Sequence, residues 1–165
     1  MKIIIKICSA ICILLILASC ERDDLCPEGT PVTPQLVIEF FDADNPTELL
    51  APRNLGIIEE GAETGFAVTG TTIFVPLRTN VDQTRFLFVL NSSDANDNNP
   101  ENIDQLILDY NRTEDFISKA CGFRVSYSNL QEQIFAGDDG FWIENIEVVN
   151  PIIENENETH IRIFH

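Results

Sequence analysis

The feature that most restricts the fold is an alternation of apolar and polar side chains that recurs along much of the chain. In the segment CGFRVSYSN, the residues Cys121, Phe123, Val125 and Tyr127 fall on one side and small or polar residues on the other. Successive side chains of a β-strand point to opposite faces, so this pattern predicts strands with one buried face. Similar segments occur at residues 36–42, 72–79, 85–91, 104–112, 141–150 and 159–165.

Turn-forming residues separate these segments, and no long window shows the 3.6-residue period of a helix. We expect only a short helical turn near residues 114–120. Segment 85–91 is apolar on both faces, which predicts a central strand, whereas Pro76 predicts a sheet edge or a bulge. Seven or more strands predict an all-β fold, an antiparallel β-sandwich of immunoglobulin-like or transthyretin-like type. With 44% hydrophobic residues and 11 Phe, the chain can fill such a core.

The N-terminus has the three parts of a secretion signal. Lys2 and Lys6 provide the positive charge, residues 7–17 are apolar, and Ala18-Ser19 is a small-residue cleavage zone. The uncharged stretch is shorter than the ~20 residues that span a bilayer, so we expect removal rather than retention as a membrane helix.

The segment LASC, ending at Cys20, resembles the lipobox of bacterial lipoproteins. This resemblance implies that Cys20 receives a diacylglycerol, becomes the first residue of the mature chain and is also N-acylated. Two or more acyl chains anchor a protein stably, whereas one binds only marginally. The expected organisation is therefore a signal peptide at residues 1–19, a lipid anchor and linker at 20–35, and a β-sandwich domain at 36–165.

The cysteine count predicts one disulfide. Cys8 and Cys12 leave with the signal peptide and Cys20 carries lipid, so that Cys26 and Cys121 are the two of the five cysteines that remain. An envelope compartment permits oxidation. The alternative is two separate thiols, with Cys121 buried as a small apolar residue. A bond at Cys26 also predicts a short tether, because six residue steps from Cys20 span at most about 20 Å.

The charge of the chain limits its partners. Removal of residues 1–19 takes away Lys2 and Lys6 and no acid, so the net charge changes from −17 to −19. The basic residues are scattered singly along the sequence, and such an acidic chain repels phosphates, which excludes nucleic acid as a partner. Residues 91–104 are polar and low in complexity, which predicts a long loop.

The whole mature chain resembles a group of Bacteroidetes lipoproteins known as a domain of unknown function. The resemblance lies in LCPEGTPVTPQLVIEFFD, VPLRT, DQLILDYNR, SKACGFR and ENETHIRIF, with the two cysteines and the His-containing last strand as its most specific part. It implies lineage and location but no activity. The segment CERDD also resembles the signal that exports Bacteroidetes lipoproteins to the cell surface, although Arg22 stands where Lys is common. Surface and periplasmic locations both stay open.

Candidate metal sites are weak. Asp42 and Asp44, and likewise Asp94 and Asp97, offer the spaced oxygens that calcium prefers, but neither segment completes an EF-hand, and solvated turns explain both. The two histidines, His160 and His165, are five residues apart and fall on opposite strand faces. We expect His160 to be exposed on the outer face, and no metal to be bound by the pair.

The sequence also lacks the parts of a catalytic site. There is no G-x-S-x-G elbow and no Cys-x-x-Cys motif, and the spacing of Gly61, Gly65 and Gly70 indicates hairpin turns rather than a phosphate loop. We therefore expect no enzyme and no cofactor. The expectation is an outer-membrane lipoprotein that acts as a non-catalytic interaction or structural module for an envelope protein partner. The alternative is a ligand- or calcium-binding lipoprotein.

Overall fold

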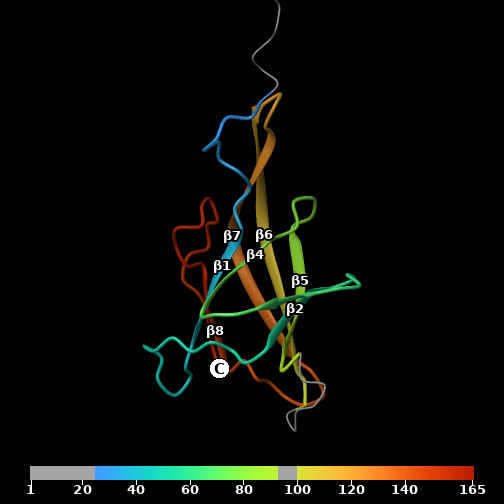
Figure 1. Cartoon of the computed structure of the whole chain (residues 1–165), viewed down its shortest axis with the longest axis vertical. Coiled ribbons are helices and arrows are strands. Elements are labelled where there is room, and N and C mark those ends of the chain that lie inside the picture. The colour runs from blue at the N-terminus through green and yellow to red at the C-terminus, as the bar shows by residue number, and fades with distance from the viewer. Residues whose placement is uncertain (1–24, 93–99) are drawn as a thin grey trace, which may run out of the picture. The chain divides into compact units, whose positions relative to one another are not determined.

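The computed structural model describes residues 25–92 and 100–165, which form nine β-strands and no helix (Figure 1). The all-β prediction is confirmed. In these residues no helical segment is present that could cross a membrane. The strands are β1 (Leu36–Phe41), β2 (Leu55–Glu59), β3 (Phe66–Val68), β4 (Thr72–Val75), β5 (Gln83–Leu90), β6 (Asn102–Ser118), β7 (Gly122–Ala136), β8 (Asn145–Val148) and β9 (Ile161–Phe164).

The chain divides into two compact units. Of the described residues, the smaller contains 25–31 and 116–123, and the larger contains 32–92, 100–115 and 124–165. Strands β6 and β7 contribute residues to both. The larger unit begins within the expected linker, since Pro34 is already buried there.

The larger unit contains a five-stranded antiparallel sheet with the order β3-β2-β5-β6-β7. Strand β5 pairs with β2 on one side and with β6 on the other, from Gln83 opposite Asp109 to Leu90 opposite Asn102. In Figure 1, β5, β6 and β7 run alongside one another from green to orange. The prediction of a central strand for residues 85–91 is confirmed.

The second sheet has the order β4-β1-β9-β8. Strand β1 pairs antiparallel with β4 and parallel with β9, while β8 and β9 are antiparallel. Pro76 directly follows β4, which is an edge strand, as the sequence predicts. An edge tolerates this residue because proline has no N–H to donate to a neighbouring strand.

The two sheets enclose one hydrophobic core. Alternate side chains of β1, β5, β6 and β9 are almost completely buried, and together they form a single cluster. This arrangement agrees with the predicted sandwich, because each sheet hides one face against the other. Its fully buried members include Leu36, Ile38, Phe40, Leu55, Ile57, Phe88, Leu106, Leu108, Ile153, Ile161 and Ile163.

Several sequence expectations differ from the structure. The hairpin formed by β2 and β3 was not predicted as strands, although glycines were read as turn residues there. Gly61 has a φ of +88°, and a Cβ on Gly65 would lie 2.4 Å from the carbonyl oxygen of Ile57, so both positions require glycine. Because the two strands are only five and three residues long, their alternation was too brief to detect.

The predictions for the β6–β7 hairpin contain two errors. The helical turn near residues 114–120 is wrong, because β6 continues to Ser118. Phe123 is 66% exposed and does not share a buried row with Val125 and Tyr127. The pairing of β5 with β6 ends at Asp109, so the alternation beyond that residue has no β5 strand beside it.

Candidate functional site

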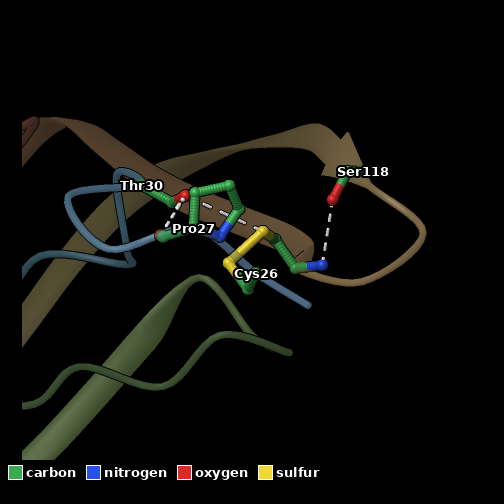
Figure 2. The surroundings of a disulfide bond; sticks show 5 residues. Cys26, Pro27, Thr30 and Ser118 are labelled. Carbon is green, nitrogen blue, oxygen red and sulfur yellow. Dashed lines mark hydrogen bonds between the residues drawn. A yellow bond between two sulfur atoms is a disulfide. The ribbon is translucent and has the colours of Figure 1, made fainter. Parts of the chain in front are cut away.

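A disulfide bond joins Cys26 to Cys121 across 95 residues of sequence, and this is the pair that the cysteine count predicts (Figure 2). Cys26 precedes a tight turn in which the backbone N–H and the hydroxyl of Thr30 both donate to the carbonyl oxygen of Pro27, at 3.3 and 2.7 Å. Gly29 has a φ of +79°, which the third residue of a type II turn requires. The Thr30 hydroxyl oxygen also lies 3.8 Å from the sulfur of Cys121.

Cys121 lies in the turn that connects β6 to β7. Ser118 Oγ accepts a hydrogen bond from the backbone N–H of Cys121 at 3.0 Å, and Gly122 follows with a φ of +73°. On the strands beside this turn, the rings of Phe116 and Phe123 make an edge contact with 5.2 Å between centroids. Residues 25–31 and 116–123 are called the disulfide unit below.

The proposed lipidation site lies outside the described residues. Cys20 belongs to residues 1–24, as do Cys8 and Cys12, which the sequence predicts to lie in a signal peptide. The first described residue is Leu25, whose side chain is 83% exposed.

A second candidate site is a cleft of about 440 Å³ in the larger unit. The loop between β4 and β5 forms one side. The start of β5 and the part of β6 that pairs with it form the other. Its volume falls within the range of small-molecule sites, roughly 300–1,000 Å³. It is lined by Glu60, Arg78, Val81, Asp82, Gln83, Arg85 and Asp109, and is called the charged cleft below.

Ion pairs and amide contacts arrange the charges of this cleft. Arg85 Nη1 lies 3.3 Å from Glu60 Oε2, and Arg85 Nε donates to Gln83 Oε1 at 2.7 Å. The amide nitrogen of Gln83 in turn donates to Asp109 Oδ1 at 2.7 Å. Arg78 donates to Glu59, and this contact raises the pKa of Arg78. Exposed pairs of this kind contribute little stability, so a bound ligand can replace them at low cost.

Buried hydroxyl groups hold the backbone of Arg78. Its N–H donates to Thr84 Oγ1 at 3.0 Å, and its carbonyl oxygen accepts a hydrogen bond from the Tyr110 hydroxyl at 3.0 Å. The Thr84 and Tyr110 oxygens are 2.5 Å apart, so the Thr84 hydroxyl donates to Tyr110 and completes a ring of hydrogen bonds. Burial raises the pKa of Tyr110, which keeps its proton available for this ring. The backbone of Arg78, one of the cleft residues, is therefore held by a closed ring of hydrogen bonds, while its charged side chain is exposed.

Sequence reasoning missed the charged cleft. Arg78, Arg85 and Arg112 are separated in sequence and were read as scattered single charges, but all three lie at or beside this one site. Arg112 donates from Nε to Asp82 at 2.7 Å and from Nη1 to the carbonyl oxygen of Thr79 at 2.6 Å. The sequence contains a partial signal, since Asp82 and Gln83 are polar residues at the start of an otherwise apolar segment.

The calcium candidates do not gather into a described site. Asp42 Oδ1 accepts hydrogen bonds from the backbone N–H groups of Asp44 and Asn45 at 2.9 and 3.3 Å, which stabilises a local turn. Asp94 and Asp97 lie outside the described residues. Within residues 25–92 and 100–165, no group of three or more His, Cys, Asp or Glu side chains is placed to hold a metal ion.

The prediction that His160 is exposed is wrong. This side chain is buried, and its Nδ1 accepts a hydrogen bond from the backbone N–H of Val37 at 3.0 Å. Burial lowers the pKa of His160, although Glu158 and Glu156 act in the opposite direction. The neutral ring therefore joins β1 to the residue before β9. The alternation of the last strand could not reveal this, because His160 lies just before β9 begins.

Asp104 is a second buried polar residue that the sequence did not single out. Its Oδ2 accepts hydrogen bonds from the backbone N–H groups of Trp142 and Ile143 at 3.0 and 2.8 Å. Burial raises the pKa of Asp104, against the effect of these two donors. The indole N–H of Trp142 donates to the carbonyl oxygen of Phe88 at 3.1 Å. These contacts explain why residues 141–144, predicted as part of a strand, instead form an ordered segment before β8.

The fold and the sites together define a disulfide-bonded β-sandwich protein with a charged cleft. Residues 57–165 match the model of a family of unknown function (DUF6452), and the chain belongs to that family. The matched range includes Cys121 and the charged cleft but neither Cys26 nor β1. No curated protein and no solved structure matches the chain.

Proposed function

We propose that this protein is a lipoprotein of the bacterial outer membrane, of Bacteroidetes type, anchored through Cys20. The LASC lipobox, which ends at Cys20, is the observation that carries the proposal. The bond between Cys26 and Cys121 supports it, because such bonds persist in oxidising compartments and this one uses both cysteines that remain after processing. The acidic pair after Arg22 supports export to the cell surface, and a location facing the periplasm is the alternative.

Mass spectrometry of the mature protein tests the anchor. We expect the N-terminal peptide to begin at Cys20 and to carry a diacylglycerol and an amide-linked acyl chain. Cys20→Ala should abolish lipidation and leave an uncleaved or a soluble precursor, whereas the matched variant Cys12→Ala, within the signal peptide, should be lipidated and processed normally. An unmodified Cys20 thiol in the mature protein would contradict the proposal. Protease treatment of intact cells separates the surface from the periplasmic location.

We propose further that the β-sandwich acts as a non-catalytic interaction module for an envelope protein. Its charged cleft offers both signs of charge, and electrostatic complementarity with a partner favours selective recognition. The fold itself supports only the general role, because sandwich domains serve many functions.

Affinity capture with matched variants tests the interaction. The lipidated protein is purified from detergent-solubilised envelopes, together with Arg85→Ala in the cleft and Arg162→Ala on β9. The two arginine side chains are equally exposed, at 44%, and each lies near one glutamate. We expect a stoichiometric protein partner that the Arg85 variant loses and the Arg162 variant keeps. Equal retention by both variants would remove the cleft from the interaction.

The second candidate function is the binding of a small ligand in the same cleft. Its volume and its paired cationic and anionic side chains favour a zwitterionic molecule over a purely anionic one. Calorimetric titration with free amino acids tests this alternative, and titration with calcium tests the cation alternative. Heat with an amino acid that Arg85→Ala abolishes, in the absence of a protein partner, would favour ligand binding.

A further inference from the structure

An exposed aromatic pair flanks the turn of the disulfide unit. Phe116 is 59% exposed and Phe123 is 66% exposed, more than any other phenylalanine in the described residues. The two rings contact each other, and Leu25, which precedes Cys26, is 83% exposed. Exposure of several large apolar side chains in one small unit to water is unfavourable, so contact of this surface with an apolar partner is favourable.

The covalent structure limits where that partner can be. The chain from Cys20 to Cys26 spans at most about 20 Å. Because the disulfide bonds Cys121 to Cys26, it also limits the distance of Cys121 from Cys20. Phe116 and Phe123 both lie within five residues of Cys121 in sequence. If Cys20 carries lipid, the aromatic pair is therefore held close to the membrane surface.

The charges nearby indicate what kind of membrane contact is possible. The disulfide unit and the residues that join it to Cys20 contain more acidic than basic side chains, so anionic headgroups do not attract it. Aromatic rings favour the boundary between headgroups and acyl chains, where apolar contact drives binding. The charged residues concerned are Glu21, Arg22, Asp23, Asp24, Glu28 and Lys119.

We propose that the disulfide unit is a second membrane contact, in which Phe116, Phe123 and Leu25 enter the interfacial layer of the bilayer that holds Cys20. This inference rests on the proposed lipidation of Cys20. The acyl chains provide attachment, and the aromatic pair fixes the disulfide unit against the lipid surface. Because apolar contact drives the insertion, it is insensitive to salt on zwitterionic lipid and is weaker on anionic lipid, which repels the acidic side chains.

Depth-dependent quenching of tryptophan fluorescence tests the contact. The lipidated full-length mature protein carries Phe123→Trp, and the matched control carries Phe135→Trp, at a 49% exposed position on β7 in the larger unit. Both proteins retain the buried Trp142 as a common background. They are reconstituted into phosphatidylcholine vesicles whose acyl chains are brominated. We expect the Phe123→Trp protein to lose about twofold more fluorescence than the control, at both low and high salt.

Each alternative outcome has a distinct meaning. Equal quenching of the two proteins, with lipid on Cys20 shown by mass spectrometry of the same samples, overturns the membrane contact and leaves the lipoprotein proposal intact. Absence of lipid on Cys20 overturns both. If the soluble Cys20→Ser protein is a dimer that Phe116→Ser and Phe123→Ser together dissociate, the aromatic pair binds a second copy and the membrane contact is wrong.

Discussion

Reduction of the Cys26–Cys121 bond should lower the free energy of unfolding by about 2–4.5 kcal/mol. The bond closes a loop of 95 residues, and the chain-entropy model gives about 4.5 kcal/mol for a loop of that length. The lower end applies if the reduced folded protein releases residues 25–31, because the hydrogen bond from Thr30 to Pro27 is internal to this segment and does not hold it to β6 or β7. Release would return some conformational entropy to the folded state and offset part of the loss.

Guanidinium denaturation of the mature chain carrying Cys20→Ser measures this effect. Trp142, the single tryptophan, is buried in the larger unit and reports its unfolding. Oxidised and reduced samples are compared, and the double variant Cys26→Ala with Cys121→Ala serves as a control that reductant should not affect. Thr30→Val, which removes one hydrogen bond without cutting the cross-link, should cost only about 1 kcal/mol.

The result that refutes this reasoning is a coincidence of the oxidised and reduced unfolding midpoints. It would mean that closure of the 95-residue loop does not contribute to the stability of the folded protein. A change in the denaturant slope alone, without a change in midpoint, would indicate an altered unfolded state and would also contradict the prediction.

Three further predictions concern buried polar groups, each measured by chemical denaturation. Tyr110→Phe should destabilise the protein by about 1–3 kcal/mol, because the carbonyl oxygen of Arg78 loses its buried donor. The stability of the wild type relative to Asp104→Asn should fall as the pH rises above 3.8, because burial in the folded state raises the pKa of Asp104 and disfavours its ionised form. A difference in stability that does not change with pH would contradict this. The wild type should lose stability as the pH falls below 6.5, since folding lowers the pKa of His160, whereas His160→Asn, which keeps an acceptor for Val37, should be less sensitive over that range.

The parts of the fold that could be predicted depend on local pattern. Residues 85–91 are apolar on both faces because β5 is the central strand of its sheet. Their composition alone therefore indicates a buried strand. Pro76 indicated an edge for an equally local reason, the missing N–H. By contrast, the parallel pairing of β1 with β9 joins segments more than 120 residues apart, and no local signal records which strands become neighbours.

The cysteine pairing was predictable because it depends on counting rather than on packing. Once three of the five cysteines are assigned to the signal peptide and the lipid, only one intramolecular bond is possible. The exposure of Phe123 was not predictable in this way. Alternation predicts which side chains share a face of a strand. It does not predict where the pairing of β5 with β6 ends, and this end at Asp109 leaves the rest of the β6–β7 hairpin without β5 beside it.

The charged cleft, like the exposure of Phe123, could not be predicted from the local sequence pattern. A chain with a large excess of acidic residues uses Arg78, Arg85 and Arg112 at or beside one site, yet their positions in sequence are 7 and 27 residues apart. Their proximity follows from the β5–β6 register, which sets Gln83 opposite Asp109 and so brings the two ends of the intervening chain together. Cations that each have an acidic partner add little to stability. Their concentration around the backbone that Thr84 and Tyr110 hold is the observation on which the proposed interaction role of the cleft rests.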